Sequence, residues 1–433
     1  MPRPSTKPLT FIDAFAGCGG LSLGLMQAGL TGRFAIERDK FAFSTLKANL
    51  LVKGAPYKYV WPRWLPKEPI GIVELLRDYS EQLEEISGSV DLLVGGPPCQ
   101  GFSSAGRRQH NDPRNQLFAS YLNLVDIIKP KAVLIENVRG FTLDFCTGDE
   151  IKNFSQALKE RLSDDYTVHE RLLDLSNFGV PQARTRYFVL AFRSDLNVPN
   201  PFEHLQSRLP SFLRSLRLTV PVSSGAAISD LEVGRSGTRP SKESKGFEET
   251  CYVGPLTHYQ KLMNAACEIP SDLRLARHAK NIVDRFKEII ELSHAEGRLN
   301  TSIGAEMRSR FGLKKMALRV LDPDRPAPTI TSMPDDLLHY SEPRTLTVRE
   351  NARLQSFPDW YAFQGKYTTG GQRRKQEVPR FTQVANAVPP LAARAIGETL
   401  TDLLRSKPET ALASDRKPRS SLHGVEQGAE VCA

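Results

Sequence analysis

The chain has 433 residues, of which 40% are hydrophobic and 25% charged, a composition typical of a soluble globular protein with a large core and one smaller domain. No window approaches a membrane span and the first residues lack the features of a signal peptide, so we expect a cytoplasmic protein without membrane contact. The six cysteines form no CxxC pair, which disfavours a zinc site or a disulfide framework, whereas the net charge of +9 favours a polyanionic partner.

Short apolar runs rich in β-forming residues alternate with helical patterns through the first half of the chain. Strands are predicted at 9–13, 34–37, 90–94, 132–136 and 187–192. Helices are predicted between them at 21–28, 41–50, 72–79, 115–128 and 151–162, where apolar residues recur at three- and four-residue spacing. The alternation predicts an α/β fold with a doubly wound, mostly parallel sheet, and ligands at the carboxyl ends of the strands.

The alternation decays between about 195 and 324 into stretches rich in serine, glycine and arginine, with a helical pattern at 281–293. This segment is predicted to form a separate, irregular domain. Helical patterns return at 347–356 and at 391–404, the second directly after Pro389 and Pro390. The polar, aperiodic residues 407–433 are predicted to be disordered. For the proline-rich loop at 55–69, the sequence predicts no role.

The turn after the first predicted strand, residues 15–20, has the sequence Phe-Ala-Gly-Cys-Gly-Gly. Such a turn lets a nucleotide-like cofactor approach the backbone closely, with the next helix N-terminus facing an anionic group. Its spacing is not that of a GxGxxG fingerprint, so a plain tight turn remains an alternative. Glu37 ends the second strand, where a carboxylate can hold both ribose hydroxyls; a surface acid is the alternative.

Cys99 lies in the nonapeptide at 95–103, Gly-Gly-Pro-Pro-Cys-Gln-Gly-Phe-Ser, directly after the third predicted strand. Two prolines fix the backbone before the cysteine and the flanking glycines allow a sharp turn. A reactive thiol needs such a fixed and partly open position, so Cys99 is the leading candidate for a nucleophile. The alternative is a small buried cysteine in an ordinary turn, which would not require the whole rigid nonapeptide.

Polar residues mark two further strand ends. Glu136 ends the fourth strand, so parallel topology brings its carboxyl group to the sheet edge of Cys99, where it can donate a proton to a ring nitrogen. A solvated or helix-capping acid is the alternative. Arg184 and Arg186 lie on one face at the start of the next strand and suit recognition of an anion or a carbonyl group, although paired surface arginines are common.

Basic residues cluster twice in the second half of the chain. Residues 373–375 are Arg-Arg-Lys, and 301–320 contains one acid against five basic residues, Arg308, Arg310, Lys314, Lys315 and Arg319. Each cluster can contact phosphates or form a solvated face.

Six segments resemble, in order, the conserved blocks of the DNA (cytosine-5)-methyltransferases. They are residues 15–20, 96–103, 136–138, 182–186, 344–359 and 383–389. The resemblance implies an active enzyme that transfers a methyl group from S-adenosyl-L-methionine to C5 of a cytosine rotated out of duplex DNA. The unmatched segment between about 193 and 319 is where this family keeps its variable target-recognition region.

The resemblance also implies roles for single residues. The implied catalytic set is Cys99, Glu136, Arg184 and Arg186: the thiolate adds to C6 of the base, Glu136 engages the N3 and N4 edge, and Arg186 holds the ring carbonyl. The implied cofactor set, with no metal, is Phe15, Gly17, Gly19, Glu37, Asp78, Pro97 and Asn386. In it, Phe15 stacks on the adenine and Asp78 meets the adenine amine. Residues 101–115 correspond to a mobile loop that closes on DNA.

The implied organisation is a catalytic and cofactor-binding domain at 1–194, a target-recognition domain with a hinge at 195–380, a C-terminal helix at 381–406 that returns to the first domain, and a tail at 407–433. Arg344 and Glu350 would organise the recognition scaffold. A monomer and a separately acting cognate restriction endonuclease are expected.

Two other functions are alternatives for this pattern. A tRNA cytosine-5 methyltransferase is disfavoured by the long irregular insert, which suits sequence reading in duplex DNA. An inactive DNA-binding homologue is disfavoured by the intact Cys99 and Glu136.

Overall fold

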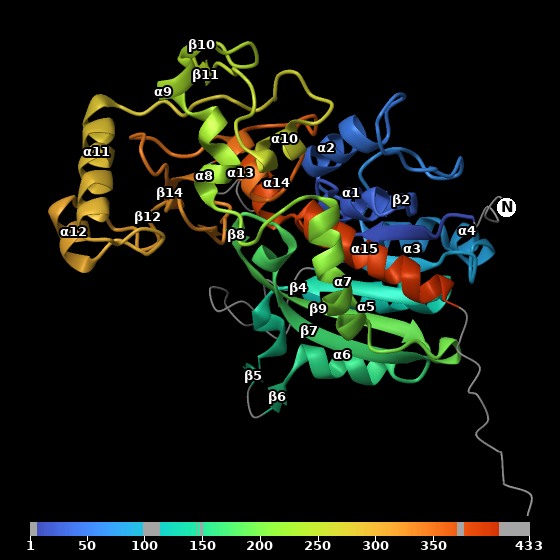
Figure 1. The fold of residues 1–433 in the computed structure, drawn as a ribbon. Coiled ribbons are helices and arrows are strands. Elements are labelled where there is room, and N and C mark those ends of the chain that lie inside the picture. Colours follow the sequence, from blue (N-terminus) through green and yellow to red (C-terminus); the bar gives the residue numbers. More distant parts are fainter. Residues whose placement is uncertain (1–6, 98–112, 144, 148–149, 370–375, 407–433) are drawn as a thin grey trace, which may run out of the picture.

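A six-stranded sheet forms the centre of the computed structural model, which describes residues 7–97, 113–143, 145–147, 150–369 and 376–406. Helices cover both faces of this sheet (Figure 1). In spatial order the strands are β2 (Thr31–Ile36), β1 (Thr10–Ala14), β3 (Leu92–Gly95), β4 (Ala132–Asn137), β9 (Thr185–Arg193) and β7 (Tyr166–Asp174). β2 to β4 pair in parallel, and β9 is antiparallel to both of its neighbours. The predicted doubly wound, mostly parallel sheet is confirmed.

Successive side chains of the strands enter two separate apolar cores, as the two-residue period of a strand requires. On β1, Phe11 faces one core and Ile12 faces the other. The Phe11 core is closed by α1 (Gly20–Gln27), α2 (Lys40–Leu50), α7 (Pro201–Ser215) and α15 (Pro390–Arg405). The Ile12 core is closed by α3 (Ile72–Asp78), α4 (Ser80–Glu85), α5 (Pro113–Ile128) and α6 (Phe154–Leu162).

α15 packs directly on α1 although some 370 positions separate them. A Cβ atom on Gly24 would lie 2.4 Å from the carbonyl oxygen of Pro390 and from Cβ of Ala393, so this distance between the helices requires glycine. The contact brings the end of the described chain beside the first strand-to-helix turn.

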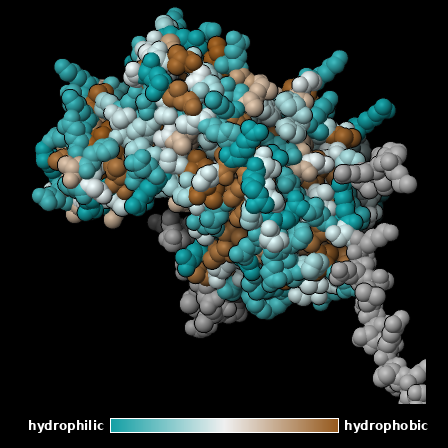
Figure 2. Space-filling view, in the orientation of Figure 1, coloured by the Kyte–Doolittle hydropathy of each residue, from teal (hydrophilic) through white to brown (hydrophobic). Residues whose placement is uncertain are grey.

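The second part of the chain contains one long helix, α11 (Lys280–Ala295), among short helices and strands. The short elements are α8 (Ser224–Ile228), α9 (Val233–Ser236), β10 (Thr238–Pro240), β11 (Glu248–Thr250), α10 (His258–Asn264), α12 (Ala305–Arg310), β12 (Arg319–Val320), β13 (Ala327–Pro328), β14 (Leu337–Leu338), α13 (Val348–Leu354) and α14 (Arg380–Asn386). Phe286, Ile289 and Met307 belong to a small apolar core around α11 and α12. Hydrophilic side chains project over the region of α11 (Figures 1 and 2).

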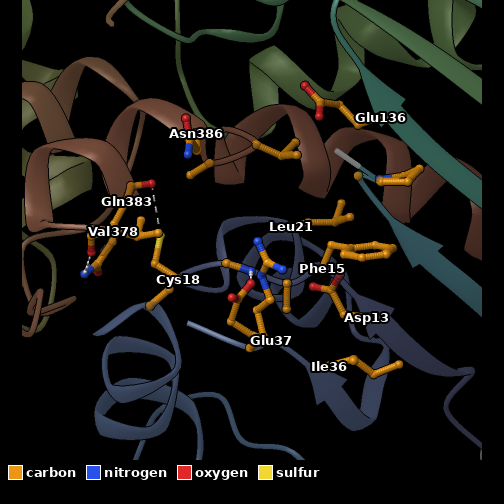
Figure 3. A pocket seen from close by; sticks show the side chains of 18 of the residues that line it. Asp13, Phe15, Cys18, Leu21, Ile36, Glu37, Glu136, Val378, Gln383 and Asn386 are labelled. Atoms are coloured by element: carbon orange, nitrogen blue, oxygen red, sulfur yellow. Dashed lines mark hydrogen bonds between the residues drawn. The ribbon is translucent and has the colours of Figure 1, made fainter. Parts of the chain in front are cut away.

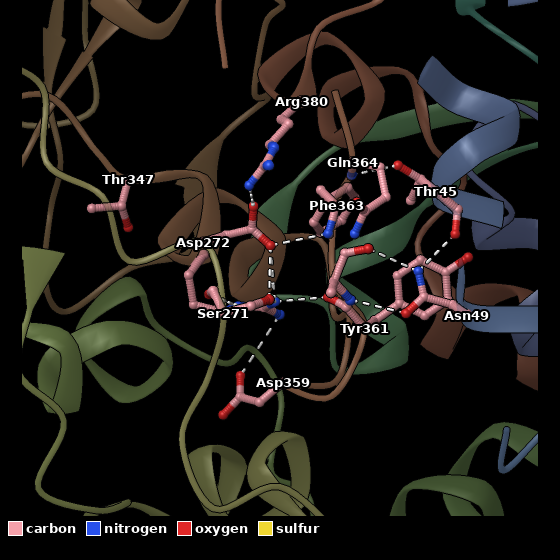
Figure 4. A network of polar contacts seen from close by, with 12 residues as sticks. Thr45, Asn49, Ser271, Asp272, Thr347, Asp359, Tyr361, Phe363, Gln364 and Arg380 are labelled. Atoms are coloured by element: carbon pink, nitrogen blue, oxygen red, sulfur yellow. Dashed lines mark hydrogen bonds and ion pairs between the residues drawn. The ribbon is translucent and has the colours of Figure 1, made fainter. Parts of the chain in front are cut away.

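A strand pairing joins this part to the sheet domain, and buried polar contacts hold its own segments together. β13 pairs with β8 (Gln182–Ala183), just ahead of β9, whereas β5 (Phe145–Thr147) and β6 (Glu150–Lys152) form a hairpin of their own. Asp272 accepts hydrogen bonds from Arg380 Nη1 at 2.7 Å and from the Phe363 N–H at 3.0 Å (Figure 4). α13 adds a buried bidentate pair, with Arg344 Nη1 and Nη2 lying 2.8 and 2.7 Å from the carboxylate oxygens of Glu350.

The structure differs from the sequence predictions at several elements. β7 was not predicted because it is an edge strand with the polar run His169, Glu170 and Arg171 in place of an apolar one. α7 was also missed, although its Asn200 cap and Pro201 are an ordinary helix start, and it extends the helix layer past the predicted boundary at 194. α6 begins only at Phe154, since 150–152 form β6.

The predicted disordered tail at 407–433 lies outside the described residues. Within the described ranges, no helix combines the length and the apolar character needed to cross a membrane.

Candidate active site

A cavity of about 550 Å³ opens at the carboxyl ends of β1 to β4 (Figure 3). Its wall is completed by the first residues of β9 and by the segment 378–388, which includes α14. β9 is antiparallel, so its amino end meets the carboxyl ends of the other strands at this edge. The predicted site residues that line the cavity are Phe15, Gly17, Glu37, Pro97, Glu136, Arg184, Arg186 and Asn386.

The floor of the cavity is the turn between β1 and α1. The Gly17 N–H donates a hydrogen bond to Glu37 Oε2 at 2.9 Å, and the Asp39 N–H donates to Glu37 Oε1 at 2.6 Å. Burial raises the pKa of Glu37. Gly17 has a φ of 56°, and a Cβ atom there would meet nothing within 4 Å, so the backbone itself faces open space. The floor can therefore receive a ligand in direct contact with the main chain.

Two residues of the predicted cofactor set do not line the cavity. Gly19 precedes α1 with a φ of 90°, and a Cβ atom there would lie 2.8 Å from Tyr361 Oη, so its role is in the packing of the turn. Asp78 is exposed at the end of α3 and is held by Arg77, whose Nε lies 2.6 Å from Asp78 Oδ1. Asp78, which a spacing match suggested, therefore lies outside the cavity. The residues of this region that line the cavity are 70–74, including Glu74.

The cavity wall at the end of β4 and the start of β9 carries one carboxylate, of Glu136, and two guanidinium groups, of Arg184 and Arg186. It is called the base-side wall below. Glu136, 9% exposed, lies with Oε1 3.1 Å from Arg186 Nε, and Arg186 Nη1 donates to the Thr185 carbonyl at 2.8 Å. Arg184 is 2% exposed, and within the described ranges its Nε and Nη1 have no hydrogen-bond partner. Burial and the charge of Arg186 lower the pKa of Arg184 to about 9. This wall therefore offers donors and positive charge to an electron-rich ligand.

Gly96 and Pro97, the last described residues before Cys99 in the sequence, lie along this same wall. Asn137 Nδ2 donates to the Pro97 carbonyl at 3.1 Å, and a Cβ atom on Gly96 would lie 3.4 Å from Glu136 Oε2. Pro97 is thus fixed beside the end of β4, two positions before the cysteine. Three predicted features lie outside the described residues: Cys99, the part of the predicted loop 101–115 up to residue 112, and the basic run 373–375.

Cys18 is a thiol that lines the cavity and is unsuited to attack. It is buried, its Sγ donates to the Gln383 carbonyl at 3.5 Å (Figure 3), and burial raises its pKa to about 12. A thiol held in this state at neutral pH is a poor nucleophile.

α14 supplies Gln383 and Asn386 to the cavity. Gln383 was not predicted; its Oε1 accepts a hydrogen bond from Thr45 Oγ1 at 2.6 Å and its Nε2 donates to the Val378 carbonyl at 3.0 Å. It fixes the segment 378–388 to α2. Asn386 is exposed at the helix end, where its amide can face a ligand.

Asp13 is the second cavity residue that the sequence analysis missed. It is 1% exposed, and Ser22 Oγ, which lies 2.5 Å from Tyr59 Oη, donates a hydrogen bond to its Oδ2. Burial raises the pKa of Asp13 to about 7. An acid within the otherwise apolar run 11–14 was the available signal, since such a residue seldom enters a core without a reason.

Asp13→Asn is expected to change how stability depends on pH. The folded pKa lies above the unfolded value of 3.8, so folding binds a proton and the wild-type free energy of unfolding falls as pH rises from about 4 to 7. At about 1.4 kcal/mol per pH unit, the whole decrease is on the order of 4 kcal/mol. Urea unfolding across this range should show a flatter profile for the variant; parallel profiles would contradict the assignment.

Known DNA methyltransferases are similar to this chain in sequence and in fold. The family model for C-5 cytosine-specific DNA methylases matches residues 9–402. The type II methyltransferase M.DdeI of Desulfomicrobium norvegicum is 31% identical over 91% of this chain and 88% of its own length. M.XorII of Xanthomonas oryzae pv. oryzae is 30% identical over 93% and 87%. A prophage-encoded E. coli chain assigned as a DNA modification methyltransferase superposes with a TM-score of 0.65 at 25% identity, covering 92% of this chain and all of that one.

Proposed function

The chain belongs to the C-5 cytosine-specific DNA methylase family, and from that premise we propose that it transfers a methyl group from S-adenosyl-L-methionine to a cytosine rotated out of duplex DNA. One observation carries the proposal: a single cavity is lined by a nucleotide-type floor at Phe15, Gly17 and Glu37 and by the polar wall of Glu136 and Arg186. A methyl donor and a base can therefore meet in one cavity.

The floor fits S-adenosyl-L-methionine. Glu37 uses its carboxylate for two backbone N–H groups and keeps acceptor capacity for ribose hydroxyls, while Phe15 offers an aromatic face to the adenine. Gly17 and Pro97 admit the chain of the ligand, and Asn386 approaches from α14. When bound, the cofactor supplies a methyl group activated by a sulfonium.

The base-side wall suits covalent activation of cytosine. In the proposed reaction the Cys99 thiolate forms a bond to C6, and the displaced electron pair makes C5 nucleophilic enough to take the methyl group. Loss of the C5 proton then returns the electrons to the ring and expels the thiolate. Glu136 holds the N3 and N4 edge, and Arg186 orients Glu136 and holds the ring carbonyl. The buried guanidinium of Arg184, whose Nε and Nη1 have no hydrogen-bond partner among the described residues, adds positive charge.

Glu136→Gln is expected to lower single-turnover methyl transfer by about 10²- to 10⁴-fold, because the amide can no longer give a proton to N3. The measurement is transfer of labelled methyl from S-adenosyl-L-methionine to duplex DNA, with 5-methylcytosine identified as the product. Glu170→Gln is the matched control, since Glu170 lies on the same sheet but outside the cavity, against Tyr187 and Lys159. Equal rates for the two variants would remove Glu136 from the reaction.

The biological setting is proposed on the same basis. We expect a cytoplasmic, monomeric enzyme of the restriction-modification type, in which residues 195–380 read the DNA site and a separate endonuclease cleaves the unmodified sequence. The type II relatives support this setting. Sequencing of methylated DNA from cells that express the protein would give the site; scattered methylation without a common sequence would contradict it.

A further inference from the structure

A basic surface on α2 and on the loop that follows it has no part in the proposed reaction. Between residues 40 and 69 the chain has six basic residues and one acidic residue, Glu68. All six are exposed, none lines the cavity, and within the described ranges none forms an ion pair. They are called the α2 basic surface and are Lys40, Lys47, Lys53, Lys58, Arg63 and Lys67.

The loop packs back along the helix, so the two segments form one surface. Lys40 and Lys47 lie on the exposed face of α2. Lys47 Nζ donates a hydrogen bond to the Lys67 carbonyl at 3.1 Å, and the Tyr59 N–H donates to the Leu50 carbonyl at 3.1 Å. α2 and the loop lie together at one side of the molecule, where hydrophilic side chains project (Figures 1 and 2).

Aromatic contacts and the sheet hold the loop in place. The Trp61 ring packs edge-on against the rings of Phe43 on α2 and Tyr59, with centroids 6.2 and 5.7 Å apart. The Val60 N–H donates to the Gly32 carbonyl at 2.8 Å, so the loop covers the free edge of β2. The charges are therefore carried by a backbone of fixed shape.

Several basic side chains elsewhere at the surface are compensated by acids of the same chain. In the predicted basic cluster at 301–320, Arg310 pairs with Glu288, and on the sheet domain Arg161 pairs with Asp126. The α2 basic surface has no such pair among the described residues. Uncompensated charges of one sign repel each other, so an anion from outside the chain would stabilise this surface.

The strand order separates the α2 basic surface from the base-side wall. β2 is one edge of the sheet, and β4, which carries Glu136, lies three strand spacings away, about 14 Å. The loop lies beyond β2, on the side away from β4. The surface is therefore better placed for a second segment of DNA than for the one whose base enters the cavity.

We propose that the α2 basic surface binds the phosphate backbone of a second segment of duplex DNA, without reading its sequence, while the cavity acts on the first. Positive charge is sufficient to bind phosphates, and counterion release drives the binding. An acidic protein fits less well, because lysine supplies five of the six charges and is depleted in protein interfaces. The inference rests on the proposed DNA substrate and adds a second binding surface to it.

The triple variant Lys53→Gln/Lys58→Gln/Arg63→Gln tests the proposal, since these exposed side chains have no hydrogen-bond or ion-pair partner among the described residues. The measurement is binding of a labelled duplex of about 20 A·T base pairs, which offers no cytosine to the cavity. The variant should bind it about 10- to 100-fold more weakly at low salt, and its slope of log affinity against log salt should be shallower by up to about 3. Its single-turnover methyl transfer to a short cytosine-containing duplex should match the wild type.

The control Lys7→Gln/Lys129→Gln/Arg405→Gln removes the same charge from exposed positions before β1, after α5 and at the end of α15. It should bind the A·T duplex nearly as the wild type does. Equal weakening in this control would reduce the effect to net charge and overturn the proposal. Polyglutamate that displaced the duplex as well as unlabelled DNA of equal charge would also overturn it, in favour of an acidic protein partner.

A second arm uses protein whose cavity is already occupied. A complex trapped covalently on a short duplex that carries 5-fluorodeoxycytidine should still bind the labelled A·T duplex, and the triple variant trapped in the same way should bind it 10- to 100-fold more weakly. A trapped wild-type complex that binds no second duplex would refute the second surface and leave the proposed reaction intact. Failure to form the trap would count against the reaction, and the binding of the free proteins would still decide on the surface.

Discussion

Cys99→Ala is expected to abolish methyl transfer, with a loss of about 10⁴-fold or more, while binding of duplex DNA stays close to that of the wild type. Without the sulfur no bond to C6 can form, and C5 of an unmodified cytosine is too weak a nucleophile to take the methyl group. Single-turnover transfer and DNA binding should be measured on the same preparation.

Cys251→Ala is the control for this experiment, because Cys251 is a half-buried thiol outside the cavity wall. It should leave both measurements unchanged. Turnover by Cys99→Ala within tenfold of this control would refute the nucleophile assignment. Loss of DNA binding in Cys99→Ala would show instead that the substitution disturbs the segment around it.

Arg353→Met is expected to lower the free energy of unfolding by about 3–5 kcal/mol. Arg353 on α13 is fully buried; its Nη2 lies 2.6 Å from Asp359 Oδ2 and 3.1 Å from Asp230 Oδ2. Methionine fills much of the space but removes the counter-ion of Asp230 and leaves Asp359 with the more distant Arg349, whose Nη1 lies 3.9 Å from Asp359 Oδ1. The loss should be seen as a lower urea midpoint for unfolding.

Arg310→Met provides the comparison, since Arg310 forms an ion pair with Glu288 at the surface. Exposed pairs contribute about 0–1 kcal/mol, so this variant should unfold close to the wild type. A loss below 1 kcal/mol for Arg353→Met would mean that the buried pairs do not stabilise the packing of α13 against the segments that carry Asp230 and Asp359.

The sheet and its ligand edge could be predicted because each feature is local in sequence. The central strands are continuous apolar runs, and the polar residue that follows a run, as Glu37 or Glu136 does, comes to the same edge in any parallel sheet. β7 escaped prediction since an edge strand carries no such run. Asp78 was misplaced because a short spacing match does not fix whether a helix end faces the cavity or solvent.

The second part of the chain was far less predictable. Its strands are only two or three residues long, so no period can develop, and its organisation depends on partners distant in sequence. Arg349 and Asp272 are 77 positions apart, and Arg349 Nη2 lies 3.5 Å from Asp272 Oδ2. Asp13 was missed for a related reason: its burial, and the lack of a hydrogen-bond partner for its Oδ1 among the described residues, depend on the strands and helices that pack around it.

Covalent trapping tests the central claim most directly. With S-adenosyl-L-methionine and duplex DNA that carries 5-fluorodeoxycytidine throughout one strand, C5 has no proton to lose, so the thiolate cannot be expelled. We predict a complex that survives denaturation and whose DNA-linked peptide contains Cys99. A wild-type protein that methylates ordinary DNA but forms no such complex, or a Cys99→Ala variant that forms it equally well, would contradict the account.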